Sequence, residues 1–168
     1  MTARGRKAAE FLALHDANPP LLLPNCWDGG SAKVFGWIGF SALATTSSGC
    51  AATFGRLDGA VAADDVFAHC ASIVACTPLP VSADLENGFA DDPAGVAATI
   101  ETARAVGLAG CSIEDFTGRH DEPIYDAAFA ADRIAAAAEA AGAAGDRIVL
   151  TARAENYLHG RADLADTI

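Results

Sequence analysis

Short apolar segments alternate with longer amphipathic stretches along most of this chain. Each apolar segment is rich in Leu, Val, Ile or Ala and is too short for a buried helix, so we expect it to be a strand. The expected strands are Leu21–Asn25, Ser41–Thr46, Leu79–Ala83, Gly110–Asp115 and Ile148–Arg153. Strands that alternate with helices predict a parallel sheet, with the carboxyl ends of all strands at one edge.

The stretches between the strands have helical spacing and recognisable ends. Expected helices cover Thr2–Asn18, Ala32–Trp37, Ala62–Cys76, Pro93–Val106, Asp126–Ala141 and Arg161–Ile168. Asp92 is the predicted N-cap of the fourth helix, with Pro93 at its first position. The residues predicted to face inward are Phe11, Leu12, Leu14, Val66, Ile73 and Val74. The Gly- and Ser-rich segment Ser47–Gly59 is predicted to be a long functional loop, and residues 142–145 a turn.

Two parallel architectures fit this alternation. A doubly wound sheet could close with five strands, but no Gly-x-Gly-x-x-Gly turn follows the first strand. A (β/α)₈ barrel places its chemistry at the carboxyl ends of its strands, and it typically needs about 250 residues. The 168-residue chain stops inside its last expected helix. We therefore expect one domain over residues 1–168, a TIM-type (β/α)₈ barrel truncated after about five β/α units.

Composition narrows the class of partner. The formal net charge of −11 disfavours nucleic acid, which requires a basic face. No segment approaches the length of a membrane span, and no signal peptide is recognisable, so no membrane partner is expected. The five cysteines include no Cys-x-x-Cys pair, which favours free thiols and a cytoplasmic protein. Cys111 lies on an expected strand and is predicted to be a packing residue.

Charged residues end three of the expected strands. Asp84 and Glu86 follow one strand, Glu114 ends the next, and Arg153 ends the last. Neighbouring acids at a strand end suit a hard divalent cation. Each has a structural alternative: Asp84 as a helix cap, Arg153 as an ion-pair partner of Glu155 or another acid. Asp115 is expected to point away from Glu114, because side chains alternate along a strand.

The order of several short motifs resembles the isocitrate lyase and phosphoenolpyruvate mutase superfamily. The matching pieces are Pro24-Asn-Cys-Trp-Asp28, Thr45-Thr-Ser-Ser-Gly49, Asp58-Gly59, Asp84-Leu-Glu-Asn-Gly88, Ser112-Ile-Glu-Asp115 and Thr151-Ala-Arg153. This resemblance implies a (β/α)₈ barrel that uses Mg²⁺. It also implies a small 2-oxo or 2-hydroxy carboxylate substrate, whose C–C or P–C bonds are made or broken through enolate-like intermediates.

The resemblance also implies roles for particular residues. The acids that would hold Mg²⁺, directly or through water, are Asp84, Glu86, Glu114 and Asp58. Asp58 has an alternative as a turn former with Gly59. The loop residues Ser48, Gly49 and Cys50 would bind substrate oxygens through backbone N–H groups and a hydroxyl. Arg153 would clamp a substrate carboxylate with its bidentate guanidinium. Asp28 is expected to order the first loop rather than to touch substrate.

One loop departs from the lyase pattern. Lyases of this superfamily have a Lys-(Lys/Arg)-Cys-Gly sequence after the Glu-Asp strand, whereas here the loop is Phe116-Thr-Gly-Arg-His-Asp-Glu-Pro123. The lysine and asparagine of the phosphomutases are missing as well. Arg119 or His120 could supply a cation or a proton from this loop, and our hypothesis is that His120 is catalytic together with Arg153. His15, His69 and His159 have no evident partners in the sequence.

Three functional hypotheses follow. The first is a carbon–carbon lyase of a 2-hydroxy or 2-oxo acid. The second is phosphoryl chemistry of the phosphoenolpyruvate mutase or phosphonopyruvate hydrolase type. The third is a non-catalytic barrel fragment, because five strands leave an unpaired sheet edge and uncovered apolar surface. A full-length protein is expected to be a homo-oligomer.

Overall fold

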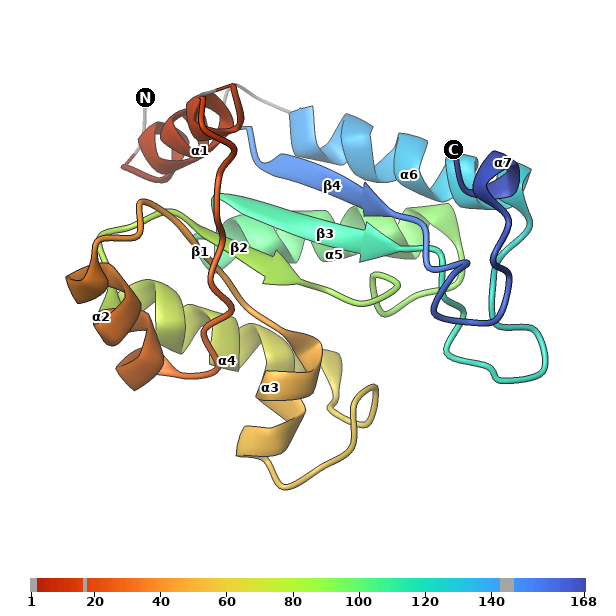
Figure 1. Ribbon diagram of the computed structural model, residues 1–168, viewed down its shortest axis with the longest axis horizontal. Helices are drawn as coiled ribbons and strands as arrows, with labels where there is room; N and C mark the ends of the chain where they lie inside the picture. Colours follow the sequence, from red (N-terminus) through yellow and green to blue (C-terminus); the bar gives the residue numbers. More distant parts are fainter. Residues whose placement is uncertain (1–2, 17, 143–146) are drawn as a thin grey trace.

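The computed structural model describes residues 3–16, 18–142 and 147–168, and they form a parallel sheet with helices packed on it (Figure 1). The strands are β1 (Leu43–Ala44), β2 (Val81–Asp84), β3 (Gly110–Glu114) and β4 (Val149–Arg153). The helices are α1 (Ala3–His15), α2 (Gly29–Ile38), α3 (Ser47–Thr53), α4 (Ala63–Cys76), α5 (Pro93–Ala105), α6 (Ala127–Gly142) and α7 (Leu164–Thr167). None of the described helices is long and apolar enough to cross a membrane.

The strand order decides between the two predicted architectures. Sequential strands lie side by side in the order β1-β2-β3-β4, and every pair is parallel. A doubly wound sheet would reverse its direction of growth at a switch point, and no such reversal occurs among the described strands. The prediction of a parallel α/β sheet of the barrel type is therefore confirmed.

Two predicted segments differ from the structure. The stretch Leu21–Asn25 is not a strand: only Asn25 forms an isolated bridge, to Ala44, while Leu22 is 74% exposed. The described residues therefore contain four strands rather than five. The predicted loop Ser47–Gly59 begins instead with α3, because Thr46 caps the helix by accepting a hydrogen bond from the Gly49 amide.

The other elements match the prediction with small shifts of their ends. Asp92 caps α5, with Pro93 at the first helical position, as expected. Leu12 was expected to face inward but is 39% exposed, whereas Phe11 is 1% exposed. Thr2 and Ala17 of the first expected helix, and residues 143–145 of the expected turn, lie outside the described residues.

Alternation along the strands separates an apolar face from a polar one. Val81 and Ala83 of β2 and Cys111 and Ile113 of β3 belong to the buried core, which also includes residues of α4, α5 and α6. The intervening residues pair in register across the sheet: Asp84 with Ser112, and Glu114 with Arg153. Because a strand alternates its side chains, these polar residues share the opposite face, which is the inner face in a barrel.

The helix α1 packs across the amino ends of the strands. Phe11 and Ala8 form a second apolar cluster with Ala42 and Ala109, each of which precedes a strand. A Cβ atom on Gly110, the first residue of β3, would lie only 2.5 Å from the Phe11 ring. The amino edge of the sheet is thus covered by α1 (Figure 1). The opposite, carboxyl edge carries the polar residues Asp84, Glu114 and Arg153, each the last residue of its strand.

Candidate active site

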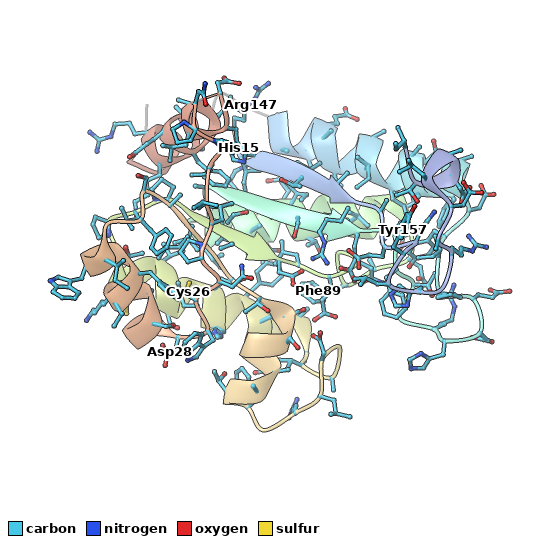
Figure 2. The ribbon with its side chains drawn as sticks, in the orientation of Figure 1. His15, Cys26, Asp28, Phe89, Arg147 and Tyr157 are labelled. Carbon is cyan, nitrogen blue, oxygen red and sulfur yellow. The ribbon has the colours of Figure 1, made fainter. Side chains whose placement is uncertain are left out.

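The predicted site residues gather at the carboxyl edge of the sheet. Two neighbouring cavities there, of about 410 and 300 Å³, share Ser47, Asp58 and Arg153 in their walls. The first also contains Ser48 and Asp84, and the second contains Glu86 and Glu114. In Figure 2, Tyr157 marks this edge, while His15 and Arg147 lie at the opposite one.

Arg153 is the positive centre of the site. Its guanidinium lies 3.3 Å from Asp84, 3.4 Å from Glu114 and 2.7 Å from Glu155. Burial by itself would lower the Arg153 pKa, but the carboxylates of Asp84, Glu155 and Glu114 together raise it. The ion pair between Arg153 and Glu155, which was the structural alternative, is therefore present. The same guanidinium also forms ion pairs with Asp84 and Glu114, two of the predicted metal ligands.

Asp84 is fixed by hydrogen bonds from two directions. Its Oδ2 accepts from the Ser47 amide at 3.0 Å, and its Oδ1 accepts from the Glu86 amide at 3.3 Å. Its own backbone N–H donates to the Thr45 hydroxyl at 3.1 Å. Asp84 thus joins the start of α3 to the end of β2, which holds the carboxylate at the cavity wall.

Glu86 occupies a strained backbone position. Its φ of +50° lies in the left-handed region that few non-glycine residues adopt. The backbone there is held by a hydrogen bond from the Glu114 amide to the Glu86 carbonyl, at 2.9 Å. Such strain concentrates at functional sites, where surrounding contacts maintain it.

The Glu86 and Glu114 carboxyl groups have little positive charge near them: Glu86 has no ion pair with a described residue, and Glu114 shares Arg153 with two other acids. Burial raises the Glu86 pKa to about 7, and the nearby Asp58 and Asp84 add to the effect. Burial also raises the Glu114 pKa to about 7, with Arg153 opposing and Asp84, Glu155 and Glu86 reinforcing the shift. Since each carboxylate repels its neighbours, an added cation would stabilise the charged forms of both.

Asp58 reaches the site through the turn that follows α3. It lines the walls of both cavities, and its charge affects the pKa of Glu86. A Cβ atom on the next residue, Gly59, would lie 3.9 Å from the Glu86 carboxylate, so the turn packs directly against that side chain. Asp58 therefore lies in a turn, as its structural alternative predicted, and it also lines both cavities, while its role toward a metal stays a prediction.

These carboxylates fit a partly hydrated divalent cation. Among the described residues, no three His, Cys, Asp or Glu side chains form a ready metal site. Mg²⁺, however, retains several waters and is commonly held by only one or two carboxylates. Glu86, which makes no ion pair with any described residue, supplies oxygen donors and negative charge of the required kind.

The three predicted substrate-loop residues have different environments. The Gly49 and Cys50 amides both donate to Thr46, at 3.4 and 2.9 Å, which leaves Ser48 as the member of the trio that lines the cavity. Cys50 is only 4% exposed, and burial followed by the charges of Glu86 and Asp58 raises its thiol pKa to about 11. The thiol is therefore protonated near neutral pH.

His120 lies on the loop that follows β3, and it lines a third cavity of about 550 Å³ with Asp58, Glu86 and Glu114.

Asp115 lines none of these three cavities, in agreement with the expectation that it points away from Glu114. Its side chain accepts a hydrogen bond from the Glu155 amide at 2.8 Å. Asp28 caps α2 by accepting from the Ser31 amide, which confirms its expected role in ordering the first loop.

Two residues near the site were not identified from the sequence. His159 lines the 300 Å³ cavity, and its ring stacks on Phe116. Arg133 of α6 is 1% exposed and donates to the carbonyls of Asn87, Ala90, Asp91 and Glu114. The signal for Arg133 was its spacing: it shares a buried helical face with Ala137 and Ala141, at intervals of four residues.

Comparison with known proteins agrees with this geometry. The sequence model of the phosphoenolpyruvate phosphomutase family matches residues 11–168. A crystal structure from Burkholderia cenocepacia J2315, named as a lyase/mutase, is 50% identical with a TM-score of 0.95, over 98% of this chain and 59% of that one. A 2,3-dimethylmalate lyase of the PEP mutase/isocitrate lyase superfamily is 31% identical with a TM-score of 0.80, over 93% of this chain and 54% of that one.

A curated relative gives the same result at the level of sequence. An uncharacterised protein of Mycobacterium tuberculosis H37Rv is 33% identical over 159 residues, which are 94% of this chain and 58% of the relative. The chain thus spans somewhat more than half the length of the relatives that it matches. The family match over residues 11–168 and these identities lead to one conclusion: the chain belongs to the phosphoenolpyruvate phosphomutase family, within the superfamily of isocitrate lyase and PEP mutase.

Proposed function

We propose that this chain carries the metal and substrate site of a Mg²⁺-dependent carbon–carbon lyase that acts on a small 2-hydroxy or 2-oxo carboxylic acid. The observation that carries the proposal is the convergence of Asp84, Glu86 and Glu114 on one edge of the sheet with Arg153 among them. Acids and an arginine at the carboxyl ends of barrel strands are the usual site of chemistry in this fold.

The bound metal would supply positive charge that stabilises an enolate-like oxyanion. The residues proposed to hold it are Asp84, Glu86, Glu114 and Asp58. Arg153 is proposed to bind a substrate carboxylate through its two parallel N–H donors, exchanging some of its contacts with acids for that ligand. The Ser48 hydroxyl, in the cavity wall beside Asp84, is proposed to donate to a further substrate oxygen. His120 is proposed to move a proton at the outer side of the site.

Two superfamily members support a carboxylate ligand of this size. The 31% identical relative is a lyase of 2,3-dimethylmalate, a hydroxy diacid. A solved oxaloacetate acetylhydrolase, 27% identical with a TM-score of 0.81 over 93% of this chain and 55% of that one, holds its product oxalate. One protein is named as a lyase of a small diacid and the other holds a small diacid as its product, which supports a ligand of this class here.

A second candidate is phosphoryl chemistry, favoured by the description of the matching family as a phosphomutase. The third hypothesis, a chain without activity of its own, is favoured by the exposed Thr151 and Ala152 on β4, beside which no further described strand pairs. A cytoplasmic location and a homo-oligomeric full-length protein remain predictions.

One assay separates these candidates. The full-length protein is incubated with Mg²⁺ and with 2,3-dimethylmalate, oxaloacetate or phosphonopyruvate, and an Asp84→Asn variant serves as the control. Cleavage of a diacid that disappears in the variant supports the lyase, and turnover of phosphonopyruvate alone supports phosphoryl chemistry. Absence of turnover with all three would count against both enzymatic proposals.

A further inference from the structure

We infer that His159 is a substrate-contacting residue that binds a second acidic group of the ligand held by Arg153; this inference rests on the proposed function. His159 follows β4 in the loop that also carries Tyr157, at the carboxyl edge of the sheet (Figure 2). It lines the same cavity of about 300 Å³ as Asp58, Glu86, Glu114 and Arg153.

The orientation of the imidazole leaves its hydrogen-bonding atoms available. The ring stacks on Phe116 with centroids 4.0 Å apart and an interplanar angle of 8°. A parallel stack occupies the face of the ring, whereas both nitrogens donate or accept within the ring plane. Neither ring nitrogen of His159 hydrogen-bonds to another described residue, so the polar edge of the half-buried ring is free to meet a ligand.

The backbone of His159 is tied to the arginine site. Its amide donates to the carbonyls of Glu155 and Asn156, at 3.2 Å each. Glu155 in turn accepts from Arg153 Nε at 2.9 Å, and its own amide donates to Asp115. The positions of His159 and Arg153 are therefore linked through one short turn, which suits two groups that bind the same molecule.

The charges around this cavity show why a second donor matters. Arg153 faces three carboxylates, those of Asp84, Glu114 and Glu155. A ligand with two acidic groups would meet strong repulsion unless another group donated hydrogen bonds to it. Among the side chains that line the 300 Å³ cavity, His159 is the one besides Arg153 with an N–H group to offer, so the ligand class that fits is a small dicarboxylate.

The test uses oxalate as the probe and a matched pair of histidines. His159→Phe keeps an aromatic ring against Phe116 but removes both nitrogens, and His159→Gln restores an amide donor. His15→Phe is the control, because His15 also packs on a phenylalanine, Phe11, with centroids 4.6 Å apart, but lies at the opposite edge of the sheet. Calorimetric titration measures Mg²⁺ affinity first and then oxalate affinity of the Mg²⁺-saturated protein.

The expected result is about a tenfold or greater loss of oxalate affinity in His159→Phe, the size of one hydrogen bond to a charged group. The loss should be smaller in His159→Gln and absent in His15→Phe, and Mg²⁺ affinity should be unchanged throughout. Wild-type affinity in both His159 variants, or an equal loss of Mg²⁺ affinity, would overturn the inference alone. Failure of the wild-type protein to bind oxalate with Mg²⁺ would overturn the inference and the proposed function together.

Discussion

The Arg153 guanidinium lies 3.3 Å from the Asp84 carboxylate, although the two residues are 69 positions apart in the chain. They stand at the ends of β4 and β2, which are separated in the sheet by β3. Because β2 and β4 run in the same direction, their carboxyl ends lie at one edge of the sheet, and this topology allows the ion pair to form. It also means that the candidate substrate arginine and a candidate metal ligand cannot be altered independently.

Replacing Arg153 tests that dependence. Arg153→Met leaves three carboxylates without their shared cation, and we expect a loss of about 1–2 kcal/mol in the free energy of unfolding, reduced from the value for a buried pair by partial exposure of the site. Arg153→Lys should recover most of that stability but bind oxalate poorly, because an ammonium group lacks the bidentate fork. Urea unfolding and oxalate titration measure the two effects. Equal oxalate affinity in the lysine variant would argue against a carboxylate clamp.

The raised pKa values of Glu86 and Glu114 predict how stability depends on pH. Both values are about 7 in the folded protein, above the ordinary 4.5, so the folded state takes up protons that the unfolded chain does not between these pH values. The contribution of these two groups to the free energy of unfolding, measured without metal, should therefore be largest below about pH 4.5. It should fall as the pH rises to about 7. We expect a loss on the order of 1 kcal/mol per group after screening by solvent.

A Glu86→Gln variant isolates one of these contributions. The amide has no charge to desolvate, so the variant should lose part of the pH-dependent destabilisation and be more stable than wild type at pH 8 without metal. Thermal unfolding between pH 5 and 8 measures the difference. A pH profile that matches wild type would show that Glu86 is not the buried, uncompensated acid described here.

The contact between Gly110 and Phe11 predicts a packing defect at the amino edge. In Gly110→Ala the new Cβ would fall 2.5 Å from the Phe11 ring, which would displace α1. Overpacking of this kind costs about 1–3 kcal/mol. Gly142→Ala is the control, since no described atom lies within 4 Å of a Cβ there. Equal stability of the two variants by urea unfolding would contradict the close approach of α1.

Replacing Arg133 should lower the free energy of unfolding more than the substitutions above, because this side chain holds several backbone segments together. Its guanidinium binds four backbone carbonyls and lies 4.1 Å from the centroid of the Tyr125 ring. Arg133→Met removes the donor that these four part-buried carbonyls share, and each carbonyl left without a partner can cost about 1–3 kcal/mol, so we expect a loss of about 3 kcal/mol or more. The exposed neighbour Asp132, changed to Ala, should cost under about 0.5 kcal/mol. A small effect at Arg133 in thermal unfolding would show that other donors replace it.

The sequence predicted the elements whose signals are local. The Asp92 cap with Pro93 located the start of α5, and strand-end charge located Asp84, Glu114 and Arg153. The helix α3 was missed because its seven residues include two serines and a glycine, and only the Thr46 cap and the Ala51–Ala52 pair indicate it. The segment Leu21–Asn25 has strand composition, but its pairing with β1 is limited to the bridge at Asn25.

Features that depend on long-range contact were not predictable from one sequence. His159 and Phe116 come from different loops, and nothing local to either indicates that their rings stack. The raised pKa values of Glu86 and Glu114 likewise depend on burial and on acids from other segments. The four-residue spacing of Arg133, Ala137 and Ala141 can be read from the sequence. Arginine is so rarely buried, however, that its residue type disfavours a buried position for Arg133.

The central claim is that acids from separate strands form one site for a divalent cation. Its most direct test is calorimetric titration of Mg²⁺ into the wild-type protein and into Asp84→Asn, which keeps an oxygen acceptor for the Ser47 amide and removes the charge. We predict saturable binding of one Mg²⁺ per chain in the wild type and at least a tenfold loss of affinity in the variant, about 1.4 kcal/mol. Absence of binding in the wild type, or equal affinity in both proteins, would contradict the account.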